Sequence, residues 1–444
     1  MHMGKIQNRL SSSQLIILGF AAVILLGSLL LLLPISTRSG QSPGFADALF
    51  TATSAVCVTG LVVQDTATFW SPFGQAVILV LIQIGGMGVV TVASTIFLIS
   101  GKRIGLKQRS TMQEAISAPK VGGIVRITGF IICMTAIFEL LGAAVMAPVF
   151  CREFGPLKGI WYSVFHSVSA FCNAGFDLMG GRAPYSSLTY YADKPLINFT
   201  MIALIVIGGI GFMTWDDVKV NKLHIWKYRM QSKVIFAATA LLILVPAVYL
   251  FFFEFTEAPL GERVLESLFQ SVTLRTAGFN TADLTAVSET GLAIMIVLML
   301  IGGSPGSTAG GMKTTTLAVL ISTTAAVFRR RGHTHFFGRR ITEDTVRNAM
   351  AILTMYLVLF LGGGLLISRV EGLPLLTCLF ETASAVGTVG LTLGVTPQLG
   401  MISRGILVLL MYLGRVGGLT VIFATLSGDQ GNVARLPQEK LTVG

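Results

Sequence analysis

Long apolar stretches alternate with short polar segments along the whole chain. Eight apolar runs carry almost no charge and have the length of about 20 residues that a helix needs to cross a hydrocarbon core ~30 Å thick. They lie near residues 15–33, 72–99, 127–149, 195–213, 234–253, 290–323, 348–368 and 403–425. The pattern predicts eight transmembrane helices. No small-residue cleavage site follows the first run, so we interpret it as a retained helix and not as a signal peptide.

A shorter apolar segment lies between the two members of each successive pair of runs. These four segments are residues 44–56, 159–171, 264–274 and 374–386. A helix of about a dozen residues reaches only ~18 Å at about 1.5 Å per residue, which is too short to cross the membrane. We therefore expect four re-entrant half-helices, each followed by a loop. The fold class is an all-α polytopic membrane protein.

The four units align at the end of the half-helix. Their sequences are FTATSAVCVTGL, FHSVSAFCNAGF, FQSVTLRTAGF and FETASAVGTVGL, so each begins with Phe and ends with Gly followed by Leu or Phe. The glycines, about 110 residues apart, are Gly60, Gly175, Gly278 and Gly390. Solenoid repeats are usually about 20–50 residues long, so this period predicts four related subdomains around a pseudo-fourfold pore. The expected repeats are 1–100, 101–215, 216–328 and 329–444, the last including a C-terminal tail.

The loops after the half-helices carry the candidate ion site. A cation that loses its water needs oxygen ligands, which rings of backbone carbonyls supply, and glycine allows such carbonyls to turn inward. The negative ends of the half-helix dipoles also favour cations. The candidate ion-binding residues are Cys57, Val58, Thr59 and Gly60; Cys172, Asn173, Ala174 and Gly175; Thr276, Ala277 and Gly278; and Gly387, Thr388, Val389 and Gly390. Arg275 adjoins the third loop, and we expect it to brace that loop through backbone hydrogen bonds.

Residues 302–311 interrupt the sixth apolar run with five glycines, two serines, a proline and a threonine. Such a segment cannot stay helical, and irregular backbone at membrane depth is tolerated only where it faces protein or water. We expect a flexible loop that gates the pore, with the hydroxyls of Ser304, Ser307 and Thr308 bonding freed backbone groups. The candidate gate residues in this segment are Gly302, Gly303, Ser304, Gly306, Ser307, Gly310 and Gly311.

Three related glycine motifs lie within other apolar runs. They are IGGMG at 84–88, IGGIG at 207–211 and a looser GRVGG at 414–418. Small residues let helix backbones approach closely. For the first two motifs, tight helix packing is the expected role.

Composition and charge place the chain in a membrane. Hydrophobic residues make up 53% of the chain and charged residues 12%, about half the charge of a soluble domain. This leaves no room for a sizeable enzyme domain outside the membrane. The net charge of +11 lies in three short loops, 101–126, 215–233 and 324–347, which the positive-inside rule assigns to the cytoplasm. Aromatic residues do not interleave with this charge, which argues against nucleic acid as a partner.

Enzyme and metal chemistry find little support in the sequence. The five cysteines form no Cys-x-x-Cys pair, and His333 and His335 stand among arginines without further ligands. The stretch from Gly306 to Lys313 resembles a phosphate-binding loop, but Met312 separates the lysine from the glycine that must precede it. We therefore expect no enzyme activity. The apolar runs predict a multi-pass protein of the cell (plasma) membrane.

Together these motifs resemble the pore subunit of the Trk/Ktr/HKT potassium-transporter superfamily, and most closely its KtrB type. The resemblance rests on VTGL at 58–61, FCNAGF at 171–176, RTAGFN at 275–280, the segment ending in Gly311-Met312-Lys313, and GTVGL at 387–391. It implies potassium uptake through a selectivity filter, with sodium as a further candidate ion and stimulant. Sodium-selective relatives carry Ser in the first loop, so Gly60 favours potassium.

The resemblance also implies partners and a gate. It implies a homodimer in the lipid membrane, gated by a cytosolic ring of nucleotide-binding RCK subunits of the KtrA type. It places Lys313 and Arg415 in the gate below the filter, while an ion pair of either residue with Glu139 is the structural alternative. For function, the alternatives are a secondary cation transporter with a broken-helix site at midplane, or a sodium-permeable relative. Four repeats in the same direction favour a channel-like pore.

Overall fold

The computed structural model describes residues 11–99, 105–116, 122–418 and 420, and this part of the chain is mostly helical. Four helices are long and apolar enough to cross a membrane: α2 (Ser12–Leu31), α7 (Ile124–Phe154), α11 (Met230–Phe253) and α15 (Glu343–Glu371). Each opens one repeat. Only about a third of each apolar window is buried, and large side chains such as Leu26, Leu140 and Leu244 are exposed. These faces suit contact with lipid, as expected of a polytopic membrane protein.

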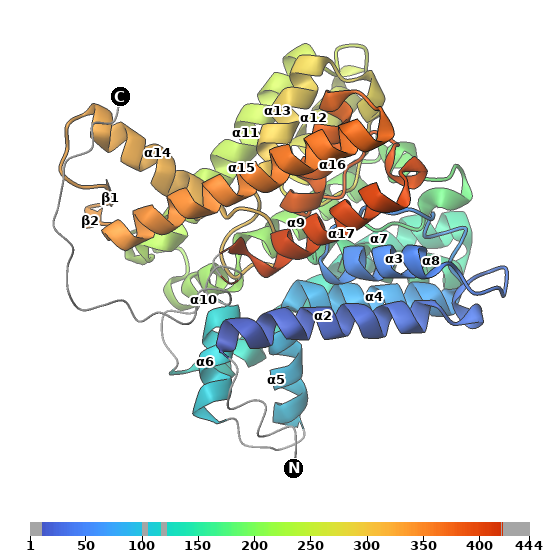
Figure 1. Cartoon of the computed structure of the whole chain (residues 1–444), viewed down its shortest axis with the longest axis horizontal. Coiled ribbons are helices and arrows are strands. Elements are labelled where there is room, and N and C mark those ends of the chain that lie inside the picture. The colour runs from blue at the N-terminus through green and yellow to red at the C-terminus, as the bar shows by residue number, and fades with distance from the viewer. Residues whose placement is uncertain (1–10, 100–104, 117–121, 419, 421–444) are drawn as a thin grey trace.

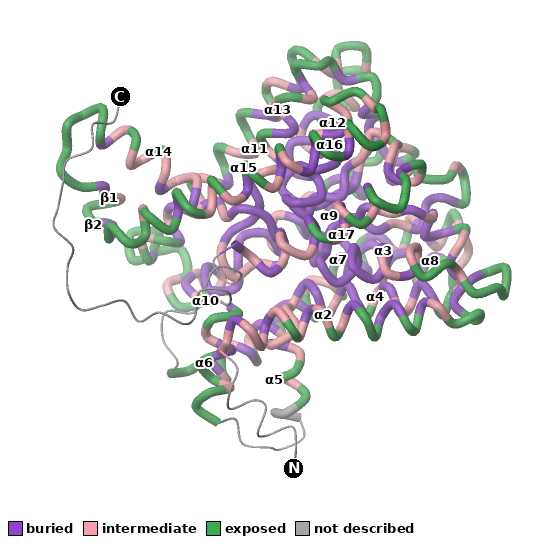
Figure 2. Tube along the Cα trace, viewed as in Figure 1, coloured by how far each residue is buried: buried purple, intermediate pink, exposed green. Residues whose placement is uncertain are grey.

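A short helix follows each long one, and all four predicted half-helices are present. They are α3 (Phe45–Val56), α8 (Pro156–Phe171), α12 (Leu260–Thr273) and α16 (Leu375–Gly387). Each buries the phenylalanine that begins the repeat motif, with at most 1% of the residue exposed. Figure 2 shows that buried residues gather around α3, α12 and α16, whereas exposed residues follow the outer faces of α2 and α11. The half-helices therefore form the interior of the protein.

The helices after the first two loops are broken, although the hydrophobic runs predict continuous spans there. α4 (Pro72–Met87) and α5 (Val89–Ile99) meet at an angle of 99°, and α9 (Pro195–Ile210) and α10 (Phe212–Asn221) meet at 93°. The residues between them, Gly88 and Gly211, have φ of +86° and +99°, a conformation that glycine adopts without steric cost. Hydropathy alone does not register this conformation, which is why the sequence predicts unbroken helices.

The remaining second helices are shorter than predicted. In the third repeat, α13 (Glu289–Leu300) and α14 (Thr314–Phe328) stand on either side of the glycine-rich segment. In the fourth, α17 (Met401–Val416) ends before Gly417, whose φ is +89°. The rest of the predicted run to residue 425 lies outside the described residues, apart from 417, 418 and 420. The predicted spans thus correspond to four unbroken helices, two bent pairs, one interrupted pair and α17.

The glycine motifs also pack closely, as predicted. A Cβ on Gly85 would collide with the carbonyl of Val56 at the end of α3, and one on Gly86 would collide with Cys172 at the end of α8. Gly208 likewise lies against the carbonyl of Phe171. These glycines let the second helices approach the ends of the half-helices.

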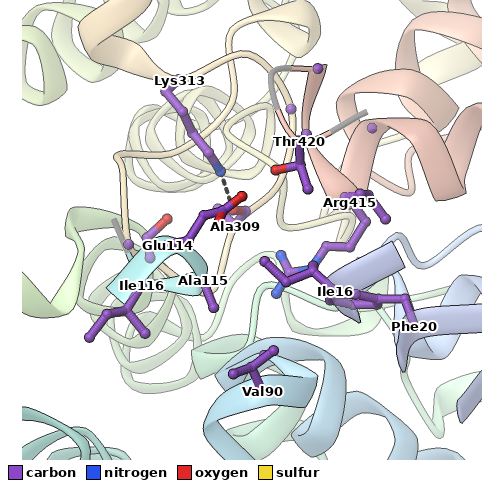
Figure 3. Close-up of a pocket in the computed structure, with 18 of the residues that line it drawn as sticks. Ile16, Phe20, Val90, Glu114, Ala115, Ile116, Ala309, Lys313, Arg415 and Thr420 are labelled. Carbon is purple, nitrogen blue, oxygen red and sulfur yellow. Dashed lines mark hydrogen bonds between the residues drawn. The ribbon is translucent and has the colours of Figure 1, made fainter. Parts of the chain in front are cut away.

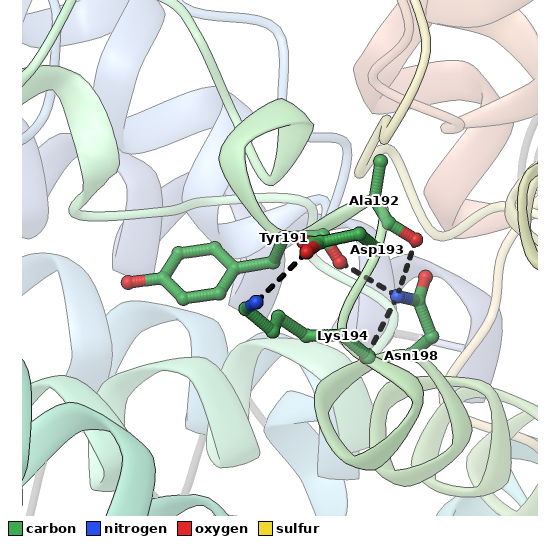
Figure 4. Close-up of polar contacts among 5 residues, drawn as sticks. All are labelled: Tyr191, Ala192, Asp193, Lys194 and Asn198. Atoms are coloured by element: carbon green, nitrogen blue, oxygen red, sulfur yellow. Dashed lines mark hydrogen bonds and ion pairs between the residues drawn. The ribbon is translucent and has the colours of Figure 1, made fainter. Parts of the chain in front are cut away.

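Loops join the helices within and between the repeats. Short 3-10 turns lie in the connections at Pro34–Ser36, Met179–Gly181, Thr189–Tyr191, Ile225–Lys227, Leu284–Ala286 and Thr396–Gln398. In the first turn of α9, Asn198 donates hydrogen bonds to the carbonyls of Tyr191 (2.7 Å), Ala192 (3.3 Å) and Lys194 (2.9 Å), while Lys194 pairs with Asp193 at 2.8 Å (Figure 4). A single side chain thereby fixes the turn that leads into the helix.

Two helical elements extend from the body on the side of the predicted cytoplasmic loops. α14 and α15 are joined by a hairpin of β1 (His335–Phe336) and β2 (Arg339–Arg340), which projects from one end of the molecule (Figure 1). The helix α6 (Leu106–Ala115) packs against α2, where Ser13 donates a hydrogen bond to Glu114. Parts of the loop 101–126 lie outside the described residues.

Candidate functional site

The four repeat glycines form a closed ring. A Cβ added to Gly60 would lie within 3.0 Å of the carbonyl oxygen of Ala174, the residue before Gly175. The same relation links Gly175 to the third loop, Gly278 to the fourth and Gly390 back to the first, where the oxygen belongs to Thr59. Real Cβ atoms do not approach other atoms so closely. All four positions therefore require glycine, because each loop occupies the space that a side chain of its neighbour would need.

The backbone of the four loops follows one pattern. The glycines have φ between +71° and +96°, and the residues two positions before them are also left-handed. These residues are Val58, Asn173, Thr276 and Thr388, with φ between +52° and +66°. Valine and threonine rarely adopt this conformation because they branch at Cβ. Such strain persists only where the surrounding structure enforces it, and it concentrates at functional sites.

Fifteen residues predicted to bind ions are thus brought together in the interior. Every one of them is buried, from Cys57 to Gly390. Asn173 donates to the carbonyl of Arg275 (3.4 Å) and so links the second loop to the third. The loops meet at the ends of α3, α8, α12 and α16, whose partly negative C-termini converge there. The arrangement offers carbonyl oxygens from four directions and no acidic side chain among these residues.

The prediction that the Arg275 side chain braces the third loop is wrong. Its Nε and Nη2 atoms are buried and have no hydrogen-bond partner among the described residues, so the guanidinium does not brace the third loop. The contact with Asn173 uses the backbone of Arg275 instead. Only its backbone carbonyl, which any residue would supply, connects it to the neighbouring loop.

The sequence reasoning missed a hydroxyl that contacts each loop. It belongs to the residue four positions after the repeat phenylalanine, which is Ser54, Ser169, Thr273 or Ser384. Each hydroxyl forms a hydrogen bond with the backbone of its own loop, at 2.6–3.1 Å. The aligned motifs show this signal, because Ser or Thr occupies the same column in all four copies.

The glycine-rich segment lies directly beside this ring. Thr308 donates its hydroxyl to the carbonyl of Phe171 (3.0 Å) and lies 3.1 Å from the side-chain oxygen of Asn173. The backbone N–H groups of Ser304 and Thr308 bond to the carbonyls of Gly209 and Gly208. The segment is irregular and runs between α13 and α14, as the composition predicts.

One of the three hydroxyls in this segment bonds to a backbone group as predicted. Thr308 satisfies a freed backbone carbonyl, whereas Ser304 pairs with the hydroxyl of Thr314 at 3.2 Å. Ser307 differs, since its buried hydroxyl has no partner among the described residues. The predicted gate glycines are also in the segment, where Gly306 and Gly311 have φ of +66° and +67°.

Lys313 and Arg415 both contact backbone carbonyls of this region. Lys313 donates to Ala309 (2.8 Å) and Gly310 (3.4 Å). Arg415 donates to Thr308 in the glycine-rich segment and to Gly85 and Gly86 beside the break between α4 and α5. One guanidinium therefore joins the segment to a bent helix of another repeat.

The alternative of an ion pair with Glu139 is wrong for both cations. Among the described residues, Glu139 accepts a hydrogen bond from Gln83 (3.3 Å), with the thiol of Cys172 at 3.8 Å. Neither Lys313 nor Arg415 forms a salt bridge with it. Glu139 instead contributes to a polar cluster behind the second loop.

A cavity of about 230 Å³ opens below the glycine-rich segment. Lys313 and Arg415 line it together with Glu114 and Ile116 from the α6 region (Figure 3). Polar and apolar groups mix on its walls, which include residues of α6 and α10. Within the described ranges, no group of three or more His, Cys, Asp and Glu residues could hold a metal, and His335 lies in the short strand β1.

Comparisons with known proteins agree with this architecture. A model of the family described as "TrkH: Cation transport protein" matches residues 7–435. The chain is 39% identical to the potassium/sodium uptake protein NtpJ of Enterococcus hirae, covering 99% of both chains. It is 37% identical to the Ktr system potassium uptake protein B of Bacillus subtilis, covering 98% of this chain and 97% of that one. The crystal structure of the potassium transporter TrkH from Vibrio parahaemolyticus has a TM-score of 0.72, with 20% identity over 92% of this chain and 83% of the other.

Proposed function

The chain belongs to the TrkH family of cation transport proteins, and from that premise we propose that it takes up potassium ions through the four-loop ring. The observation that carries the proposal is the closed ring of glycines and carbonyls. It offers oxygen ligands from four sides at the converging ends of four half-helices. A potassium ion that loses its water would exchange hydration for these oxygens, as in other carbonyl-lined filters.

Preorganisation is the main contribution of the protein in this proposal. The left-handed residues and the glycines hold the carbonyls in place before an ion arrives, so that little reorganisation accompanies binding. The four helix C-termini add negative potential where the ion loses its water. Apolar neighbours and the absence of a carboxylate in the ring keep the ion from being held too tightly to leave.

Sodium permeation is the second candidate, because one relative is named a potassium/sodium uptake protein. Two observations favour potassium. Relatives at 37% and 34% identity are named potassium uptake proteins, and the first loop carries Gly60, where a serine side chain would collide with Ala174. The decisive experiment is ion flux into liposomes that contain the purified protein, with potassium, sodium and choline compared. Potassium flux well above both others supports the proposal, and equal potassium and sodium flux favours the alternative.

The segment from Gly302 to Gly311 is proposed as the gate. It lies against the ring at Thr308, and Arg415 and Lys313 hold it through carbonyl oxygens. Hydrogen bonds of this kind contribute about 1–3 kcal/mol each, so a regulatory signal of a few kcal/mol could shift the segment between two positions. Arg415 would couple that shift to the break between α4 and α5.

We also propose a regulated homodimer. Relatives are named as parts of a Ktr system, and the sequence has basic loops at 101–126, 215–233 and 324–347 that could receive a cytosolic nucleotide-binding subunit. Sodium as a stimulant belongs to the same proposal. Pull-down from native membranes should recover a soluble subunit. Recovery of the chain alone, together with full activity in its absence, would contradict the regulatory part.

A secondary transporter remains a weaker candidate, although three second helices are broken near glycines. Transporters of that class consist of two inverted halves with a site between them. Here, four loops of the same direction meet in one ring. The ring therefore supports a continuous pathway.

A further inference from the structure

One residue on each half-helix holds the following loop through its backbone and its side chain at once. These residues are Ser54, Ser169, Thr273 and Ser384, and all four are fully buried. The backbone carbonyl of each accepts a hydrogen bond from the N–H of the residue just before the ring glycine, at 2.7–2.9 Å. The same contact in four copies makes it part of the repeat design.

The hydroxyls of these residues bind the loops in two ways. In the first and fourth repeats, the hydroxyl oxygen accepts a hydrogen bond from the N–H of Gly60 (3.1 Å) and Gly390 (3.0 Å). In the second and third repeats, the hydroxyl donates to the carbonyl after the glycine, that of Phe176 (2.7 Å) or Phe279 (2.6 Å). The two patterns follow the sequence, because the first and fourth loops end in Gly-Leu and the others in Gly-Phe.

These hydrogen bonds hold the strained, left-handed part of each loop backbone. Each loop contains a left-handed Val, Asn or Thr two residues before a left-handed glycine, and such a backbone relaxes unless its surroundings hold it. The N–H of Gly60 and Gly390 is buried and would lose its partner without the hydroxyl. A loop that loses this bond would move its carbonyls, and ion discrimination depends on the spacing of those carbonyls.

We propose that the hydroxyls of Ser54, Ser169, Thr273 and Ser384 form a ring of clamps that sets the ion selectivity of the filter without touching the ion. They are positioning residues, and the inference rests on the proposed function, because it presumes that ions pass through the four loops. A role confined to folding would change the amount of assembled protein and the total flux. A clamp on the carbonyls changes the ratio of potassium to sodium flux.

A matched pair of variants separates these roles. Thr273→Val removes a clamping hydroxyl at nearly constant volume. Thr53→Val makes the same change at a buried threonine beside Ser54, where the hydroxyl donates only to Leu49 of its own helix (2.7 Å). For each variant, potassium and sodium flux into liposomes is measured, the choline flux is subtracted as background, and the potassium-to-sodium flux ratio is calculated. Because one hydrogen bond contributes about 1 kcal/mol, we expect Thr273→Val to lower the ratio by about three- to tenfold. Thr53→Val should keep it, and Thr273→Ser should restore it.

The outcomes distinguish the clamp from the proposed function itself. If the unmodified protein does not prefer potassium over sodium, the proposed potassium selectivity fails. If it does and Thr273→Val keeps the same ratio, the clamp is overturned. Should Thr273→Val not assemble, Ser384→Ala tests the other bonding pattern. Its control is Ser163→Ala, whose buried hydroxyl bonds only to Gly159 of its own helix (2.8 Å). If Ser384→Ala and Ser163→Ala have the same potassium-to-sodium flux ratio, the clamp is also overturned.

Discussion

The four ring loops and the segment 302–311 are both irregular and buried, yet they are held in different ways. Each ring loop is fixed by its own half-helix with a bond that recurs in every copy, and by a neighbouring loop that fills the place of a Cβ. The segment 302–311 is held by contacts that do not recur from repeat to repeat. They come from the end of α9 and from the side chains of Lys313 and Arg415.

This difference suggests how selectivity and gating are separated. A ring loop cannot move without displacing its neighbours, since each carbonyl sits where the next glycine leaves space. The segment 302–311 touches the ring at Thr308 but is not part of it. In the proposed function, movement of the segment would change whether ions pass, while the ring would still decide which ions pass. The predictions below test this separation.

The largest effect is expected from shortening the segment. Deletion of residues 306–310 removes the part that Arg415 and Lys313 hold, so the proposed closed state would lose these bonds. Potassium flux into liposomes should rise by about tenfold, since about 1.4 kcal/mol of lost stabilisation of the closed state shifts a two-state equilibrium by that factor. The potassium-to-sodium ratio should stay constant. An assembled deletion variant with unchanged flux and regulation would place the gate elsewhere.

A smaller effect is expected from Arg415→Gln. This change removes charged hydrogen bonds to Thr308, Gly85 and Gly86 and so uncouples the segment from the bent helix. Because a net loss of about 1 kcal/mol changes an equilibrium about fivefold, flux should rise by about that factor. Arg404→Gln is the matched control, since Arg404 lies on the same helix but pairs with Asp47 at 2.9 Å. A rise with both variants would indicate general loosening of α17.

The smallest effect is expected from Lys313→Gln. Lys313 follows the segment by two residues and contacts its Ala309 and Gly310, so these bonds tie this part of the chain to itself and not to another repeat. An amide can still donate to one of these carbonyls. Flux should change by about twofold or less in the same liposome measurement. An increase equal to that of Arg415→Gln would show that local bonds control the gate.

The sequence predicts the repeat architecture because length and hydropathy define it. Apolar runs of about 20 residues predict membrane-spanning helices, and runs of about a dozen residues predict half-helices. The aligned glycines predict the ring. The bends at Gly88 and Gly211 escape prediction, since a positive φ leaves no trace in hydropathy. Ion binding by the loops and gating by the segment stay predictions, although the structure brings the residues together.

The charged residues show why the partners of a side chain are harder to predict than its position. A basic side chain in an apolar span suggests an acidic partner, and the sequence offers Glu139 for that ion pair. Arg415 instead uses carbonyls that the break after α4 and the segment 302–311 leave accessible. Backbone carbonyls occur at every residue, so they give no sequence signal. The hydroxyl clamps do give one, in the shared Ser or Thr column of the four motifs.

The most direct test of the central claim, that ions pass through the glycine ring, is the potassium-to-sodium flux ratio of Gly60→Ser in liposomes. A serine at Gly60 brings a Cβ against the carbonyl of Ala174, in a backbone with φ of +94°. The matched control is Gly405→Ser on α17, where a Cβ meets no atom within 4 Å. We predict that Gly60→Ser lowers the ratio by about tenfold or more, because a displaced loop costs more than a single bond, while Gly405→Ser keeps it. An assembled Gly60→Ser protein that discriminates potassium from sodium as well as the unmodified chain would contradict the account.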